Sequence, residues 1–119
     1  PMILADTSVW VDHLRRANKA FVELLEDGDV ATHPFVVGEL ACGSLKNRKT
    51  ILDLLQDLPE VDVASHNEVI ELIESRKLMG KGIGWIDAHL LAAALISGTP
   101  LWTADKKLRT ISAALGVLF

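Results

Sequence analysis

The most informative stretch of the chain is Ile3-Leu4-Ala5-Asp6-Thr7-Ser8-Val9-Trp10. A short apolar run ends in an acid and two hydroxyl residues, and an amphipathic pattern begins directly after it. This order is typical of a buried strand that leads straight into a helix, with Asp6 at the junction. In a parallel α/β sheet, such a junction lies at the carboxyl end of a strand, where ligands gather. Asp6 is therefore either the N-cap of the helix or a carboxylate of a functional site.

The composition indicates one globular unit. The chain has 119 residues, of which 50% are hydrophobic, so we expect residues 1–119 to form a single domain with an ordinary core. The longest nearly apolar run, residues 86–96, is too short to cross a bilayer. No secretory signal pattern stands at the start, so we expect a cytoplasmic protein without a membrane partner. The single cysteine, Cys42, excludes an intramolecular disulfide and a cysteine-rich zinc site.

Short apolar segments alternate with helical patterns along the whole chain. The segments that we expect to form strands are residues 2–5, 30–32, 61–63, 101–104 and 116–119. Helical patterns follow Asp6 and then cover about 20–26, 34–42, 46–57, 65–79, 85–97 and 106–115. Strands that alternate with helices predict a three-layer α/β/α fold around a mostly parallel sheet.

Four of the 16 acidic residues do not fit on polar helix faces. Glu39 shares a helical face with apolar residues, and Asp87 lies in the most apolar helical pattern, so we expect both carboxylates to point toward the core. Asp6 and Asp105 each follow a short apolar strand and precede a helix. Helix capping would explain Asp6, Asp87 and Asp105 one at a time, and a buried arginine would explain Glu39. One divalent metal site explains all four, because an unpaired buried carboxylate needs a cation or a partner.

These carboxylates indicate a site for Mg²⁺ or Mn²⁺ that acts on phosphodiesters. Oxygen ligands favour these ions, and the four histidines show no spacing that suits zinc. Bound ions of this kind activate water and neutralise charge on a reacting phosphate. The net charge of −4 equals the charge of the four carboxylates alone. Basic clusters, either solvated helix ends or a phosphate-binding rim, lie at Arg15-Arg16-Lys19, Lys46-Arg48-Lys49, Arg76-Lys77-Lys81 and Lys106-Lys107-Arg109.

Four segments in order resemble the motifs of PIN-domain ribonucleases, and their residues are most similar to those of VapC toxins from bacterial toxin–antitoxin pairs. They are residues 3–10, Gly38-Glu39-Leu40, Trp85-Ile86-Asp87-Ala88-His89-Leu90 and Leu101-Trp102-Thr103-Ala104-Asp105-Lys106-Lys107-Leu108. Any one motif is weak, but four at suitable spacing cover nearly the whole chain.

This resemblance implies a role for seven side chains. The catalytic and metal-binding quartet would be Asp6, Glu39, Asp87 and Asp105, with Thr7, Ser8 and Thr103 as supporting polar groups. It also implies Mg²⁺- or Mn²⁺-dependent endoribonuclease activity on RNA, a homodimer, a VapB-type antitoxin and a five-stranded parallel sheet flanked by helices.

Other functions fit the sequence less well. A HAD-type phosphatase needs a second acid two positions after the first, and Ser8 stands there. A response-regulator receiver needs an aspartate at the end of a central strand, whereas Asp57 ends a helical pattern. Residues 80–84 are rich in glycine but lack the spacing of a P-loop, so we interpret them as a mobile connector at the edge of the site. The remaining alternative is a non-catalytic protein-interaction module of the same fold.

Overall fold

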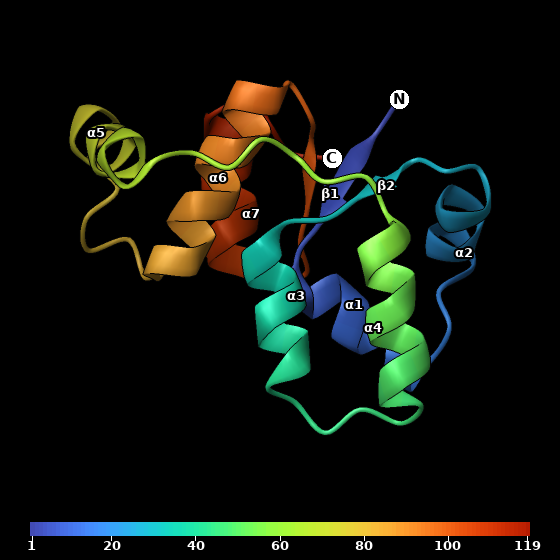
Figure 1. Ribbon diagram of the computed structural model, residues 1–119. Coiled ribbons are helices and arrows are strands. Elements are labelled where there is room, and N and C mark those ends of the chain that lie inside the picture. The colour runs from blue at the N-terminus through green and yellow to red at the C-terminus, as the bar shows by residue number, and fades with distance from the viewer.

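The computed structural model describes residues 1–119 as seven helices around a parallel three-stranded sheet in the order β2-β1-β3 (Figure 1). The strands are β1 (Ile3–Ala5), β2 (Val30–Ala31) and β3 (Leu101–Trp102). The helices are α1 (Thr7–Arg15), α2 (Lys19–Glu26), α3 (Pro34–Ala41), α4 (Arg48–Asp57), α5 (His66–Arg76), α6 (Trp85–Ser97) and α7 (Lys106–Ala114). The predicted fold class, a parallel α/β sheet flanked by helices, is confirmed.

The central strand β1 fixes where the functional side chains lie. Ile3 pairs with Val30 of β2, and Leu4 pairs with Leu101 of β3. All three residues of β1 are buried, as expected for the middle strand of a parallel sheet. Because the strands are parallel, β1 and β3 end at the same edge of the sheet, and Asp6 donates its backbone N–H to the Trp102 carbonyl at 3.0 Å.

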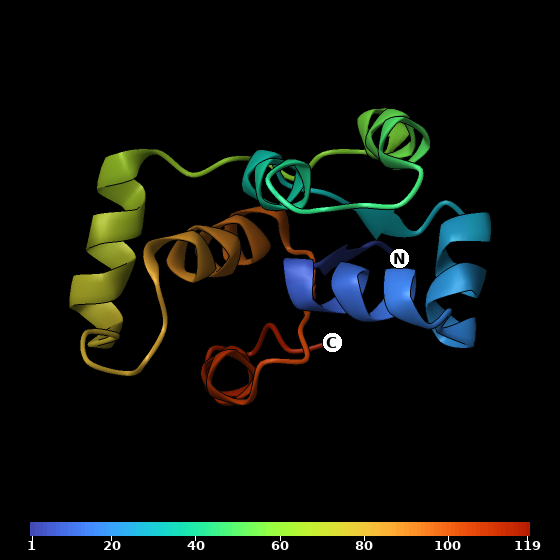
Figure 2. The ribbon, with the colours of Figure 1, turned by 90° about the horizontal axis from the view of Figure 1, so that it is seen from below.

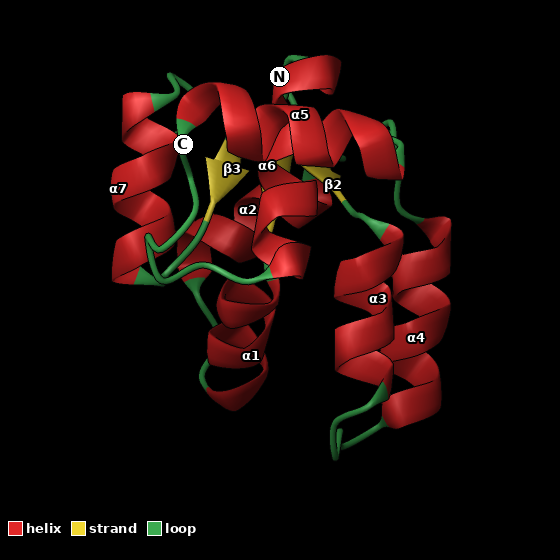
Figure 3. Ribbon diagram, turned by 90° about the vertical axis from the view of Figure 1, so that its left-hand side faces the viewer, coloured by secondary structure: helices red, strands yellow, loops and turns green.

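Helices cover both faces of this small sheet. In Figure 2 the pair α3 and α4 lies above the strands and α7 lies below them, and Figure 3 shows the same layers from the side. Helix α5 packs beside α6 at one end of the molecule, and α2 lies at the opposite end (Figure 1). The molecule measures about 40 × 28 × 24 Å, with its long direction from α5 to α2 (Figure 2).

The core forms where the sequence pattern places it. Helix α6 is the most buried helix, with every residue from Ala88 to Ala94 inside, in agreement with its nearly uniform apolar pattern. Trp10 of α1 stacks edge-on against Phe21 of α2 at 4.8 Å between ring centroids, and both side chains are buried. No helix is long and apolar enough to span a membrane.

Two of the five expected strands do not form as regular strands. Residues 61–63 form no strand, although the preceding residue, Glu60, makes an isolated bridge with Thr32; residues 116–119 contribute one isolated bridge, between Leu118 and Leu101. At the Glu60 bridge, Val61 donates its N–H to the Thr32 carbonyl. The next rung of this parallel ladder would need an N–H from residue 34, which is Pro34, the first residue of α3. The missing N–H of Pro34 and the start of α3 therefore end the pairing after one bridge, and the sheet has three strands rather than five.

Candidate active site

Asp6 is the buried acid at the centre of the candidate site, with 5% of its surface exposed. Its Oδ1 accepts hydrogen bonds from the Ser8 hydroxyl at 2.5 Å and from the Val9 N–H at 3.2 Å. Its Oδ2 accepts one from the Thr103 hydroxyl at 2.5 Å. The bond from Val9 makes Asp6 the N-cap of α1. The two hydroxyls give both carboxylate oxygens further hydrogen bonds, which offset the cost of burying the carboxylate.

The two hydroxyls are themselves held by backbone amides of the segment after β3. The N–H of Ala104 donates to Ser8 Oγ at 2.9 Å, and the N–H of Asp105 donates to Thr103 Oγ1 at 3.1 Å. Each hydroxyl oxygen thus accepts one bond, and its own hydrogen is directed to Asp6. This network joins the ends of β1 and β3, and it brings Asp105 beside Asp6 as the motif order predicts.

Asp105 and Glu39 are exposed rather than buried. Asp105 caps α7 by accepting from the Leu108 N–H at 2.8 Å. Glu39 Oε1 accepts from the Thr7 hydroxyl at 2.6 Å, which links α3 to the start of α1. The expectation that Glu39 points toward the core is therefore wrong, because α3 buries its opposite side through Val36 and Leu40.

Asp87 is half-buried in the first turn of α6. Its Oδ2 accepts from the Gly84 N–H at 3.2 Å, so this acid also serves a helix start. Burial raises the pKa of the Asp87 carboxyl, the bond from Gly84 lowers it, and the negative charges of Asp105, Asp6 and Glu39 raise it further. The other three acids therefore all act on Asp87, which means that the fold gathers the four carboxylates in one region.

Capping and clustering, which the sequence presents as alternatives, occur together. Asp6, Asp87 and Asp105 each serve the start of a helix, and those helix starts meet at one edge of the sheet. As they lie, no three of the acids are arranged to share one ion, and each carboxylate is engaged by a donor of its own. The donor set, carboxylate and hydroxyl oxygens without sulfur, nevertheless suits Mg²⁺ or Mn²⁺.

Two histidines lie deeper than the sequence indicates. His33 is completely buried and caps α3, because its Nδ1 accepts from the Phe35 N–H at 3.0 Å, while its Nε2 has no partner. Burial, and then the nearby His89, lower the pKa of His33 to about 4. The ring of Phe35 lies 4.6 Å from that of His89, which is also buried. In the sequence, the position of His33 directly before Pro34, at the expected start of a helix, is the feature that could have predicted its capping role.

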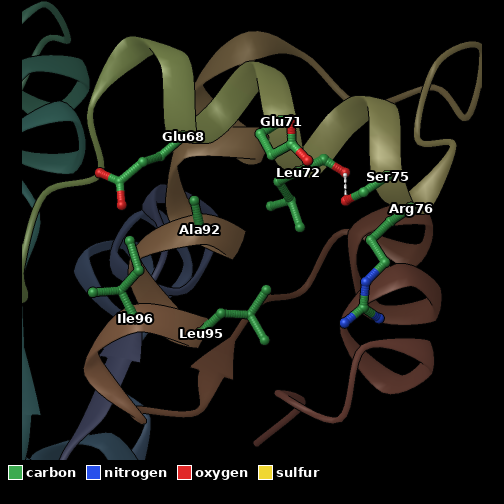
Figure 4. A pocket seen from close by; sticks show the side chains of 8 residues that line it. All are labelled: Glu68, Glu71, Leu72, Ser75, Arg76, Ala92, Leu95 and Ile96. Carbon is green, nitrogen blue, oxygen red and sulfur yellow. Dashed lines mark hydrogen bonds between the residues drawn. The ribbon is translucent and has the colours of Figure 1, made fainter.

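A pocket lies between α5 and α6, away from the four acids Asp6, Glu39, Asp87 and Asp105 (Figure 4). It measures about 320 Å³ and is lined by Glu68, Glu71, Leu72, Ser75, Arg76, Ala92, Leu95 and Ile96. The Ser75 hydroxyl turns back to its own helix and donates to the Leu72 carbonyl at 3.4 Å. None of the residues that line this pocket belongs to the predicted quartet.

The fold is shared with two solved structures. One is described as the structure of FitAB bound to an IR36 DNA fragment, with a TM-score of 0.64, 20% identity and coverage of 94% of this chain and 91% of that one. The other is the crystal structure of PAE2754 from Pyrobaculum aerophilum, with a TM-score of 0.62, 16% identity and coverage of 97% and 89%. Identities this low show a common fold alone.

Sequence comparisons are more specific. The family described as the PIN domain matches residues 3–114. Ribonuclease VapC32 of Mycobacterium tuberculosis, strains CDC 1551 / Oshkosh and ATCC 25618 / H37Rv, is 50% identical over 117 residues, which cover 98% of this chain and 94% of that protein. These matches include all four motif segments. The chain belongs to the PIN domain family and, within it, to the VapC-type ribonucleases.

Proposed function

We propose that residues 1–119 act as one nuclease domain, the toxin of a type II toxin–antitoxin pair, which cleaves RNA phosphodiesters in the cytoplasm with Mg²⁺ or Mn²⁺. The observation that carries this proposal is that the charges of Asp6, Glu39 and Asp105 all act on the half-buried Asp87 and raise its pKa. Like charges gathered at one edge of a sheet are costly without a cation. The relationship to ribonuclease VapC32 supports RNA as the substrate.

In this proposal Asp6, Asp87 and Asp105 bind the ion directly, and Glu39 binds it directly or through water. When bound, the ion makes water a better nucleophile and offsets the charge of the reacting phosphate. Ser8 and Thr103 keep the Asp6 carboxylate oriented by donating to both of its oxygens.

Thr7 holds Glu39, the exposed acid of the quartet. Its hydroxyl donates to Glu39 Oε1 and so fixes one oxygen of a long side chain, leaving Oε2 free for an ion or for water. Without a cation the four carboxylates repel an RNA strand, so substrate binding and ion binding depend on one another.

The test is cleavage of total cellular RNA with Mg²⁺ or Mn²⁺, with EDTA as the control. Asp6→Asn, Asp87→Asn and Asp105→Asn should each remain folded and lose cleavage, whereas Asp12→Asn, an exposed acid of α1 outside the quartet, should cleave like the wild type. Retained cleavage by a folded Asp6→Asn protein would contradict the assignment. A folded wild type without metal-dependent cleavage would favour the non-catalytic interaction module.

The proposed antitoxin would lie in a groove between α1, α3 and α4. This groove measures about 730 Å³, and its lining joins apolar side chains to Thr7 and Glu39. The apolar residues that line it are Val11, Leu14, Leu40, Leu45 and Ile51. An apolar helix laid in this groove would bring an Arg or Lys within reach of Glu39, where its charge would replace that of the ion.

Two measurements test the proposed assembly. Co-expression with the neighbouring small open reading frame should relieve growth inhibition and yield a complex, and Leu14→Glu should weaken that complex. Light scattering of the purified chain should give the mass of a homodimer. A monomer at micromolar concentration, or a neighbour that neither binds nor relieves inhibition, would overturn the corresponding part.

A further inference from the structure

The side chain of Lys107 lies directly over Gly82. A Cβ atom at Gly82 would stand 2.6 Å from Lys107 Cδ and 2.8 Å from Lys107 Nζ, closer than side chains approach one another. Gly82 also has a φ of +81°, which disfavours any other residue. The connector between α5 and α6 thus leaves room at this position for one specific lysine of α7.

The ammonium group of Lys107 has no partner within the protein. It makes no hydrogen bond, and no carboxylate oxygen lies within ion-pair distance, since the ion pairs of the chain are Pro1 with Asp29 and Lys49 with Asp53. Lys107 also stands in the first turn of α7, beside Lys106, and that turn holds no acid. Cations at the amino end of a helix oppose its dipole, and the acid at this helix end, Asp105, is engaged as the N-cap, so the charge of Lys107 remains available to an anion.

The two segments that hold Lys107 in place also carry two acids of the site. Two residues after Gly82, the N–H of Gly84 donates to Asp87. Two residues before Lys107, Asp105 caps α7. Lys107 is therefore next to the acidic cluster, yet it is not neutralised by it.

We propose that Lys107, seated over Gly82, binds a phosphate of the RNA strand adjacent to the phosphodiester that is cleaved. This inference rests on the proposed ribonuclease function and adds a substrate-binding residue to it. An ammonium group contacts phosphate oxygens and reads no base, so Lys107 sets the position of the strand along the site and not its sequence. Gly82 serves by leaving the space that the lysine stem occupies.

The experiment measures binding and cleavage of one labelled single-stranded RNA by the full chain. Anisotropy is recorded from low to high KCl with Ca²⁺ in place of Mg²⁺, and the RNA is checked for integrity. Lys107→Gln keeps the stem and removes the charge, and it should weaken binding roughly tenfold at low salt. The slope of log K against log salt should fall by about 0.7, the value for one phosphate contact on a single strand. In cleavage assays, Lys107→Gln should raise KM more than it lowers kcat.

Two further variants separate charge from position. Lys19→Gln removes one positive charge from α2, on the side of the molecule away from α7, and should match the wild type (Figure 1). Gly82→Ala keeps the net charge but shifts the end of the lysine side chain, so it should weaken binding less than Lys107→Gln does, with its melting temperature as a check of the fold.

Each outcome separates this inference from the proposed function. The wild type could bind and cleave RNA while Lys107→Gln and Lys19→Gln show the same slope of log K against log salt. In that case the phosphate contact is wrong and the nuclease stands. If the wild type binds RNA through Lys107 but cleaves nothing, the phosphate contact stands, while the nuclease and the position of the contact beside a cleaved bond are wrong. If the wild type does not bind RNA, both are overturned.

Discussion

Burial and three like-charged neighbours both raise the pKa of Asp87, and this makes the stability of the fold depend on pH. Between the ordinary value of 3.8 and the raised value, the folded chain holds a proton that the unfolded chain has lost. The free energy of unfolding therefore falls as pH rises through this window, and it stays lower above the window. Asp87→Asn removes the ionisable group, so it should melt at a higher temperature than the wild type at pH 7.

Thermal melting in EDTA from pH 4 to pH 8 checks this prediction. The difference between Asp87→Asn and the wild type should shrink toward zero as pH approaches 4, where both side chains are uncharged. Asp12→Asn, an exposed acid of α1, is the matched control and should follow the wild type throughout. An Asp87→Asn protein that is no more stable than the wild type at pH 7 would mean that the carboxylates do not repel one another at this site.

His33 gives the free energy of unfolding the opposite dependence on pH. Its pKa is lowered to about 4 in the fold, against 6.5 in an unfolded chain, so the unfolded chain gains a proton first on acidification. The free energy of unfolding should fall by about 3 kcal/mol between pH 6.5 and pH 4 on this account alone. His33→Asn keeps an N-cap acceptor and should flatten this part of the curve, measured by urea denaturation at each pH. An unchanged slope would contradict the assignment to His33.

At the scale of elements, the hydroxyl of Thr103 joins β3 to β1 and to the start of α7. It donates to Asp6 and accepts from the Asp105 N–H, so its removal leaves a buried carboxylate oxygen and an amide without partners. Thr103→Val has the same shape and should lower the free energy of unfolding by about 1 to 3 kcal/mol. Thr103→Ser retains the hydroxyl and should lose less. Urea denaturation measures both, and equal stability of the two variants would show that the hydroxyl is not the cause.

Helices were predictable because their signals are local. The capping box of Ser65 and Glu68 starts α5 where the helical pattern of residues 65–79 begins, and the apolar pattern of α6 gives both its bounds and its burial. Strands were less predictable, because β pairing depends on partners far away in the sequence. The segment at residues 61–63 has a strand pattern, yet it forms no strand, because the chain beside it turns into α3 at Pro34 after the single bridge between Thr32 and Glu60.

The same distinction applies to the candidate site. Asp6 and Asp105 were predictable as acids at strand ends, because strand ends of a parallel sheet share an edge. The exposure of Glu39 was not predictable from the pattern of α3, because it depends on which side of the helix meets the core. The contact between Lys107 and Gly82 joins segments far apart in the chain, so no local sequence pattern predicts it.

For the molecule as a whole, the four acids come from separate parts of the chain. Asp6 follows β1, Glu39 lies in α3, Asp87 lies in α6, and Asp105 follows β3. The unfolded chain therefore cannot present them together, and an ion that binds the quartet binds the folded state alone. Such binding raises stability by mass action, by about 2.7 kcal/mol when the free ion is at a hundred times its dissociation constant.

Mn²⁺ should therefore raise the melting temperature of the wild type at pH 7, by roughly 10 °C at that degree of saturation for a chain of this size. Asp6→Asn and Asp105→Asn should lose most of this increase, because each removes a ligand and its charge. Asp12→Asn should keep it. The rise should also shrink toward pH 4, since protonated carboxyls bind ions poorly. An equal rise in Asp6→Asn and in the wild type would place the ion elsewhere on the molecule and would separate the acidic cluster from the proposed metal chemistry.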